Sequence, residues 1–249
     1  MAKFTNLDAS SKSKFIDTAQ RWGRNVLTAA QRLFNRLVKS GSWDLRTEID
    51  KNPWKQDPHG GAKAKEWFNK EVIQHSEWFV KRSYMEPGKL YTFKYLDPKY
   101  KDDLLYYDEQ PLLLSLHHYI SKEGNVVEIG LNLHHIPQGA RIDCLCAVVD
   151  SFKKLYQGEL YRDKQKSIPM TWKQIEPITK KFGFAFAFRS YLPELMSGTI
   201  CLPFETWPKA VFLPTSGYRK MTANQILHMY FEYLKKTGNM YKPNDLRMS

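Results

Sequence analysis

Carboxylates and histidines gather in the middle of the chain, a pattern that could bind a metal ion. Carboxylates on adjacent strands would suit a Mg²⁺-dependent nuclease, because Mg²⁺ prefers oxygen ligands. Restriction-type nucleases, however, have a lysine two residues after their second acid. If Glu128 were that acid, the lysine position would be occupied by Gly130. We therefore expect turn acids and strand histidines, with no metal, no cofactor and no enzymatic activity, and keep the nuclease as an alternative. The residues concerned are Asp97, Asp102, Asp103, Asp108, Glu109, Glu128, His117, His118, His134 and His135.

Other catalytic signatures are absent from the sequence. It has no GxxxxGK[ST] or GxGxxG loop for phosphates, and no GxSxG or HExxH. Cys144 and Cys146 are too close together for paired zinc ligands, so we expect these two and Cys201 to be free, buried thiols.

Net charge is the strongest pointer to function. The chain of 249 residues has 38 Lys and Arg against 26 Asp and Glu, so the net charge is 38 − 26 = +12. Such a field attracts polyanions, which means nucleic acid or an acidic membrane surface, and we favour nucleic acid. Through residue 39 there are eight basic and two acidic residues, so 8 − 2 = +6 lies in this short segment.

The candidate phosphate-binding residues lie around three sequence features. One is an amphipathic helix predicted from Ser13 to Lys39, whose apolar stripe leaves basic side chains on its other faces. The second is the phenylalanine run from 182 to 188, and the third precedes the last predicted helix. The candidates are Lys14, Arg21, Arg24, Arg32, Arg36, Lys39, Lys180, Lys181, Arg189, Arg219 and Lys220.

Periodicity predicts an α+β fold, with basic amphipathic helices before a small antiparallel sheet or SH3-like barrel with packed helices. Helices are expected at 62–83, 140–156, 171–181 and 222–236, and strands at 90–95, 112–120, 126–133, 182–188 and 209–214. The expected division is a basic N-terminal helical arm (1–51), a linker (52–61), a connecting helix (62–86), an α+β core (87–238) and a loose tail (239–249).

Three segments resemble one known family. The run PGKLYTFKYLDPKYKDDLLYYDEQPLLL (87–114) is similar to a segment of the DNA end protector, or head-completion, proteins of T-even-type tailed bacteriophages. GLNLHHIP (130–137) and WPKAVFLPTSGYRK (207–220) continue the likeness, and KEWFNKEV (65–72) is similar in character. Leu105 and His135 depart from the pattern, which suggests a distant relative.

The resemblance implies a virion-associated protein, present in the host cytoplasm during assembly, that binds ends of linear double-stranded DNA without sequence specificity. It would protect the packaged genome termini or complete the phage head, with DNA and portal or neck proteins as partners. An alternative is a structural neck, tail or baseplate protein with no DNA role. Tryptophans would then be its interface anchors, namely Trp22, Trp43, Trp54, Trp67 and Trp78. The polar N-terminus and the lack of a long apolar run predict no signal peptide and no membrane partner.

Overall fold

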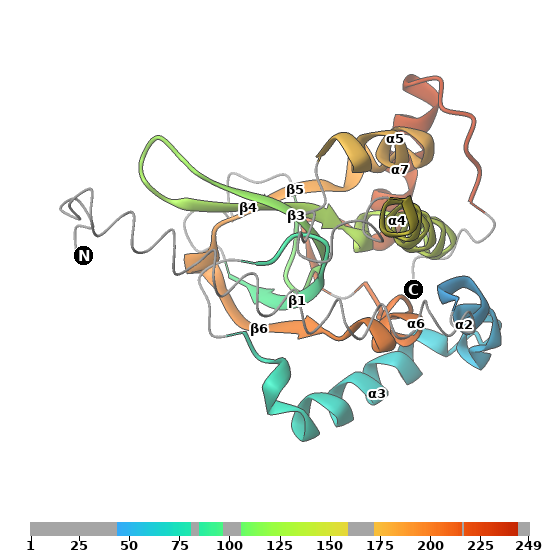
Figure 1. The fold of residues 1–249 in the computed structure, drawn as a ribbon, viewed down its shortest axis with the longest axis horizontal. Helices are drawn as coiled ribbons and strands as arrows, with labels where there is room; N and C mark the ends of the chain where they lie inside the picture. Colours follow the sequence, from blue (N-terminus) through green and yellow to red (C-terminus); the bar gives the residue numbers. More distant parts are fainter. Residues whose placement is uncertain (1–43, 81–84, 97–105, 159–171, 216, 244–249) are drawn as a thin grey trace.

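A computed structural model describes residues 44–80, 85–96, 106–158, 172–215 and 217–243 of the chain (Figure 1). These residues form an α+β fold in which one antiparallel sheet packs against helices, as expected. The SH3-like barrel is not seen, since the sheet of the described residues is open. No helix in these ranges combines the length and the apolar character that a membrane span requires.

The first described segment packs tightly on the rest of the fold. Helix α2 (Leu45–Lys51) begins at Asp44, whose carboxylate accepts from the Thr47 N–H, and it buries Leu45 and Ile49. The expected linker contains the 3₁₀ turn η1 (Pro53–Lys55) and the start of α3 (Gly60–Gln74). The Asn52 side chain donates to the Pro208 carbonyl at 3.0 Å, which fixes this segment to a distant one.

Helix α3 ends at Gln74, and the prediction that it would continue to residue 83 is wrong. His75 leaves the helical conformation, stacks on Trp78 and forms ion pairs with Glu71 and Glu77. The 3₁₀ turn η2 (Ser76–Trp78) then leads to the sheet edge, where Phe79 bridges Ile200. Sheet pairing thus replaces the helix that the local pattern favoured.

Five strands form the main sheet, in the order β5-β4-β3-β1-β6 with every pair antiparallel. Strands β1 (Leu90–Tyr95), β3 (Leu112–Ile120) and β4 (Val126–Asn132) confirm the predictions. The sheet extends beyond them through β5 (Phe188–Tyr191) and β6 (Met196–Leu202). Strands β2 (Tyr107–Asp108) and β7 (Tyr218–Arg219) form a separate short pair.

Both faces of the sheet are covered. Leu90, Leu112 and Leu114 lie in the main hydrophobic core with the helices. Tyr91 and Leu113 alternate with them and belong to a second, aromatic cluster on the opposite face. Figure 1 shows α4 (Gln138–Gly158), α5 (Trp172–Phe182) and α7 (Ala223–Lys236) gathered at one end of the sheet.

Two predicted strands are helical turns instead. After α5, Gly183 adopts a left-handed conformation and residues Phe184–Ala187 form the 3₁₀ turn η4, so the phenylalanine run does not alternate across a strand. The segment 209–214 falls in and after α6 (Trp207–Ala210), which has Pro208 in its first turn. Its run of buried residues is typical of a buried strand but equally of a buried helical turn. The remaining 3₁₀ turns are η3 (Leu133–His135), η5 (Pro193–Leu195) and η6 (Phe204–Thr206).

The last described residues make contacts with the rest of the fold. Thr222 caps α7 through a reciprocal pair of bonds with Gln225, and the helix ends before Gly238 as predicted. Beyond it, the Tyr241 hydroxyl donates to Asp143 at 2.5 Å and its ring packs edge-on against Phe182.

Candidate functional site

Most of the excess positive charge lies outside the described residues. The candidate residues of the predicted N-terminal helix all fall outside these ranges, namely Lys14, Arg21, Arg24, Arg32, Arg36 and Lys39. The described residues hold 22 basic and 18 acidic residues, so they contribute 22 − 18 = +4 to the total of +12. The segment 1–43 contributes +6, half of the excess. The folded core is therefore only weakly basic.

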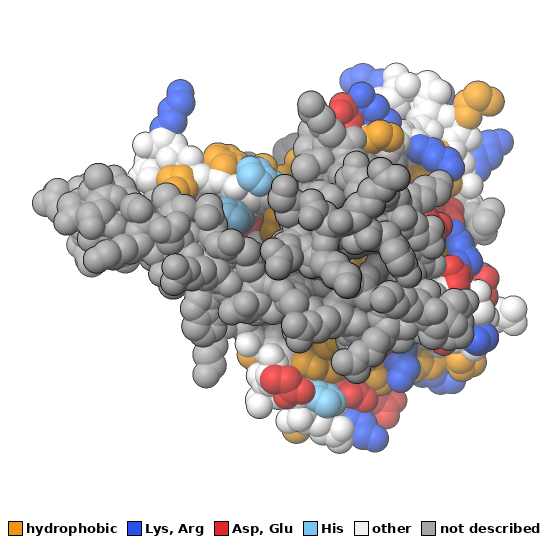
Figure 2. Space-filling view, viewed as in Figure 1, with side chains coloured by type: hydrophobic (Ala, Val, Ile, Leu, Met, Phe, Trp, Pro, Cys, Tyr) orange, Lys and Arg blue, Asp and Glu red, His pale blue; other side chains and the backbone are white. Residues whose placement is uncertain are grey.

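Lys180 and Lys181 lie at the end of α5, where the structure brings them to the end of α7. The Tyr230 hydroxyl donates to the Phe182 carbonyl at 2.7 Å, and the Asn239 amide donates to the Lys180 carbonyl at 2.6 Å. Figure 2 shows basic side chains on this corner of the molecule, at the upper right. We call the set the lysine corner; its members are Lys180, Lys181, Lys235 and Lys236, all exposed.

Sequence reasoning missed Lys235 and Lys236, although a signal existed. They occupy the last turn of the strongly amphipathic α7. Basic residues are common in the last turn of a helix because their charge interacts favourably with the negative end of the helix dipole. What the sequence does not reveal is that α5 and α7 end side by side.

Arg189 is half-buried and makes several contacts within the protein. Its guanidinium donates to the Phe186 and Phe188 carbonyls at 2.9 and 2.7 Å and to the Tyr106 hydroxyl. The same group stacks over the rings of Tyr106 and Phe186. These contacts join Arg189 to an aromatic cluster, and its role as a phosphate ligand stays a prediction.

Arg219 and Lys220 lie apart from the lysine corner, at the end of β7. Arg219 is exposed and forms an ion pair with Glu109 at 2.5 Å, so part of its charge is neutralised within the protein. Lys220 is also exposed and has a positive φ of 64°. These two therefore form a separate and weaker basic site.

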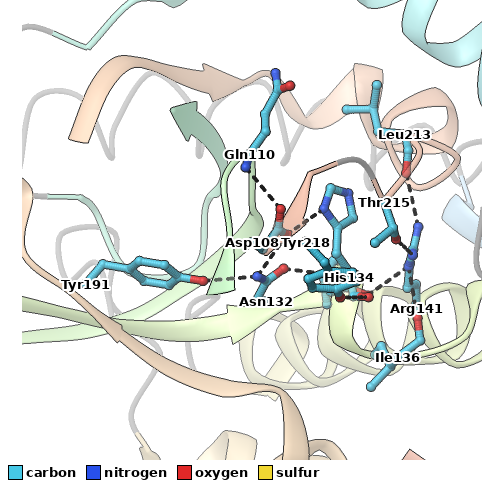
Figure 3. A network of polar contacts seen from close by, with 11 residues as sticks. Asp108, Gln110, Asn132, His134, Ile136, Arg141, Tyr191, Leu213, Thr215 and Tyr218 are labelled. Carbon is cyan, nitrogen blue, oxygen red and sulfur yellow. Dashed lines mark hydrogen bonds and ion pairs between the residues drawn. The ribbon is translucent and has the colours of Figure 1, made fainter. Parts of the chain in front are cut away.

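Of the predicted acids and histidines, Asp108 and His134 lie together in a buried hydrogen-bond network (Figure 3). Asp108 Oδ2 accepts from His134 Nδ1 at 2.9 Å and from Asn132 Nδ2 at 3.1 Å, and Oδ1 accepts from the Gln110 N–H at 3.0 Å. Asn132 Nδ2 also donates to the Tyr191 hydroxyl at 3.0 Å. Because a carboxylate only accepts, His134 carries its proton on Nδ1.

The network is enclosed by a second set of bonds that join distant segments. Buried Arg141 donates to the Leu133, Ile136 and Leu213 carbonyls at 2.8, 3.1 and 3.1 Å. Arg141 also donates to the Thr215 hydroxyl at 2.7 Å. Each such bond satisfies a buried polar atom, so the segment 133–136 is held firmly against 213–215.

A small pocket opens beside this network, and we call it the His134 pocket. Its volume is about 40 Å³. It lies between α3, β1 and the segments after β2 and α6, and is lined by Lys65, Phe68, Asn69, Thr92, Gln110, His134, Leu213 and Pro214. His134 is 3% exposed and forms part of the wall. Neither this pocket nor Lys65 was foreseen, because the lining residues come from five separate parts of the sequence.

The remaining metal-ligating residues do not come together within the described ranges, where no three histidine, cysteine or acidic side chains form a metal-sized group. Glu128 is buried and accepts from the Met85 N–H at 2.7 Å. His117 and His118 lie on β3, while Asp97, Asp102 and Asp103 fall outside the described residues. The three cysteines are free, and Cys144 and Cys146 are buried as predicted, whereas Cys201 is half-buried.

Comparison with known proteins gives one match. A family model described as phage T4 terminal DNA protecting protein matches residues 6–228, most of the chain. No curated protein matches the chain, and no solved structure does.

Proposed function

Since this chain belongs to the phage T4 terminal DNA protecting protein family, we propose that it binds the ends of linear double-stranded DNA and protects them by covering them. Contacts to phosphates supply affinity without reading the bases, so binding is independent of sequence. The observation that carries the proposal, beside the family, is that half of the positive excess lies in residues 1–43. Such a segment attached to a weakly basic folded core suits an arm that follows the DNA backbone.

The lysine corner is the part of the described surface best suited to a second phosphate contact. Two helix ends carry a combined charge of about −1 from their dipoles, and Lys180 also pairs with Glu176 at 2.8 Å. Four lysines exceed what these partners neutralise. We therefore assign phosphate contacts to the predicted arm and to the lysine corner, with Arg219 and Lys220 contributing less.

Protection by covering requires no chemical turnover, so the protein acts as a binding protein in the virion and, during assembly, in the host cytoplasm. Portal or neck proteins are its proposed neighbours. The alternative is a structural virion protein with no DNA role, with tryptophans as interface anchors. The described tryptophans among these anchors pack within the protein, which does not favour this alternative. Trp78 is buried, and Trp54 and Trp67 pack against each other and the core, with ring centroids 6.2 Å apart. Trp22 and Trp43 lie outside the described residues.

Gel-shift binding to linear duplex and to closed circular DNA of the same sequence, over a salt series without Mg²⁺, tests the proposal. We expect a preference for linear DNA, a steep salt dependence and protection of the bound ends from exonuclease. Changing the lysine corner to glutamine should weaken binding. A matched control changes four exposed lysines elsewhere, Lys51, Lys70, Lys94 and Lys122. Equal binding to both DNA forms, or none, would contradict the proposal and favour the structural virion protein.

A further inference from the structure

One atom of the buried network is left without a partner, and it belongs to a residue of the His134 pocket. Nδ1 of His134 is bonded to Asp108, but Nε2 has no hydrogen-bond partner among the described residues. Buried polar atoms are rarely left unpaired in folded proteins, because their loss of water is not compensated. Figure 3 shows the ring between Asp108 and Leu213, and Leu213 also lines the pocket. The Leu213 carbonyl lies near this nitrogen but can only accept a hydrogen bond, as can unprotonated Nε2, so the two do not satisfy each other in the neutral ring. A ligand in the pocket could therefore supply the partner that Nε2 lacks.

The other polar side chains of the pocket can all donate hydrogen bonds, namely Lys65, Asn69, Thr92 and Gln110. Lys65 and Asn69 lie one turn apart on α3 and both are exposed, so they reach the mouth of the pocket from the same face. Gln110 adds a further amide to the lining. No acidic side chain lines the pocket, and no ion pair of Lys65 exists with a described residue. This set of groups suits an anion.

The charges behind the wall also favour an anion. Arg141 is fully buried and bonded to the Leu213 carbonyl, so its positive charge lies close behind the pocket lining. Asp108 is the counter-charge on the other side of the His134 ring, and His135, Tyr191 and Tyr218 are the further titratable groups around it. The pocket volume of about 40 Å³ holds more than one water-sized group, which is the scale of a single phosphate group.

Protonation links this anion to His134. Burial lowers the pKa of His134 below its usual value, against the attraction and hydrogen bond of Asp108, so the ring is neutral in the free protein at neutral pH. The nearby Leu213 carbonyl also favours the protonated ring. An anion beside Nε2 would add to these effects. One proton would then pass from solvent to Nε2, and the N–H would donate to the bound anion.

We propose that the His134 pocket binds a phosphate monoester, held by His134 and Lys65, and that its natural source is the 5′-phosphate at a DNA terminus. The identity of the source rests on the proposed function, whereas the phosphate chemistry rests on the pocket itself. A monoester suits a small pocket because it presents three oxygens at the end of a chain. The pocket would thus bind the phosphate at the DNA terminus, while the predicted arm and the lysine corner contact phosphates along the duplex.

Inorganic phosphate is the first probe, used on the full chain at constant ionic strength with chloride as the control anion. NMR of ¹⁵N-labelled histidine should show the His134 ring changing from the neutral to the doubly protonated form as phosphate is added. Lys65→Gln should abolish this change. Lys70→Gln, an exposed lysine on the same helix outside the pocket lining, should not. No response of His134 to phosphate, or an identical response in both variants, would overturn the proposal.

Blunt duplexes with a 5′-phosphate or a 5′-hydroxyl form the second probe. We expect the 5′-phosphate to strengthen binding roughly tenfold, the order of one charge-assisted hydrogen bond. Lys65→Gln should remove the difference and Lys70→Gln should retain it. Equal binding of both duplexes by a protein that still prefers linear DNA would refute the terminal phosphate as the ligand and leave the proposed function standing. If the wild-type protein bound neither duplex but His134 still responded to inorganic phosphate, the proposed function would be refuted. Free phosphate esters would then be the ligand.

Discussion

The side-chain amide of Asn239 donates a hydrogen bond of 2.6 Å to the main-chain carbonyl of Lys180. This bond joins the end of α5 to the residue that follows the turn after α7. The last carbonyls of a helix lack partners within the helix, so a side chain from another element both satisfies one of them and fixes the two ends together. The lysine corner depends on this arrangement.

Asn239→Ala should lower the free energy of unfolding by about 1 kcal/mol, because the Lys180 carbonyl loses its short bond from Asn239 and keeps only the longer one, of 3.4 Å, from the Gly183 N–H. Urea unfolding followed by circular dichroism measures the change. Asn224→Ala, at an exposed position in the first turn of α7, serves as the control and should have a smaller effect. Equal effects of the two variants would show that the bond to Lys180 does not stabilise the corner.

Gly183→Ala should destabilise the protein more than Gly124→Ala. Both glycines have a positive φ, 71° and 84°, so both substitutions strain the backbone by about 1 kcal/mol. At Gly183 the new methyl would also lie 2.2 Å from a Leu234 methyl in the core, whereas nothing lies within 4 Å at Gly124. We expect an additional loss of roughly 1–3 kcal/mol at Gly183, measured by thermal and urea unfolding.

Glu128→Gln should remove a pH dependence of stability. Burial raises the pKa of Glu128 from 4.5 to about 7, so the folded state binds a proton that the unfolded state has released between these values. Stability contributed by this residue is therefore present below about pH 4.5 and is lost as the pH rises to about 7. The variant should gain roughly 1–3 kcal/mol over the wild type at pH 8 and little at pH 4.5.

Urea unfolding at several pH values measures this gain. Glu66→Gln, at an exposed position on α3, is the matched control and should leave the pH profile of the wild type unchanged. A constant difference between Glu128→Gln and the wild type at every pH would mean that Glu128 stays ionised in the folded protein.

Replacing Arg21, Arg24, Arg32 and Arg36 by glutamine should weaken binding to linear DNA and reduce its salt dependence. Each lost phosphate contact lowers the slope of log K against log salt by about 0.9, so the four together should lower it by roughly 3–4 units. The four-lysine control set described above should change it less. An unaltered slope would remove the N-terminal segment from the DNA interface.

Elements with a clear period could be predicted from the sequence. Strands β1, β3 and β4 follow from alternation and turn residues, and α4, α5 and α7 follow from their apolar stripes. Strand β6 was missed because MSGTICL has no clear alternation and becomes a strand by pairing with β1. The run after Gly183 was misassigned because its left-handed conformation directs the next residues into a 3₁₀ turn.

The site was harder to predict than the elements. The histidines and acids were recognised as unusual, but Asp108, His134 and Tyr191 come from three distant segments and meet only through the fold. Arg189 was identified as basic, yet nothing in its neighbourhood predicts that its donors are used by Tyr106 and two carbonyls. Charge predicts the class of partner, whereas the position of each charge depends on tertiary contacts.

The strand order β5-β4-β3-β1-β6 also determines when the protein can finish folding during synthesis. Leu90 of β1 pairs with Leu202 of β6, so the outer edge of β1 stays open until the ribosome has delivered most of the chain. An exposed strand edge invites pairing with other chains. Chains truncated before residue 196 should therefore be prone to aggregate, because they lack β6.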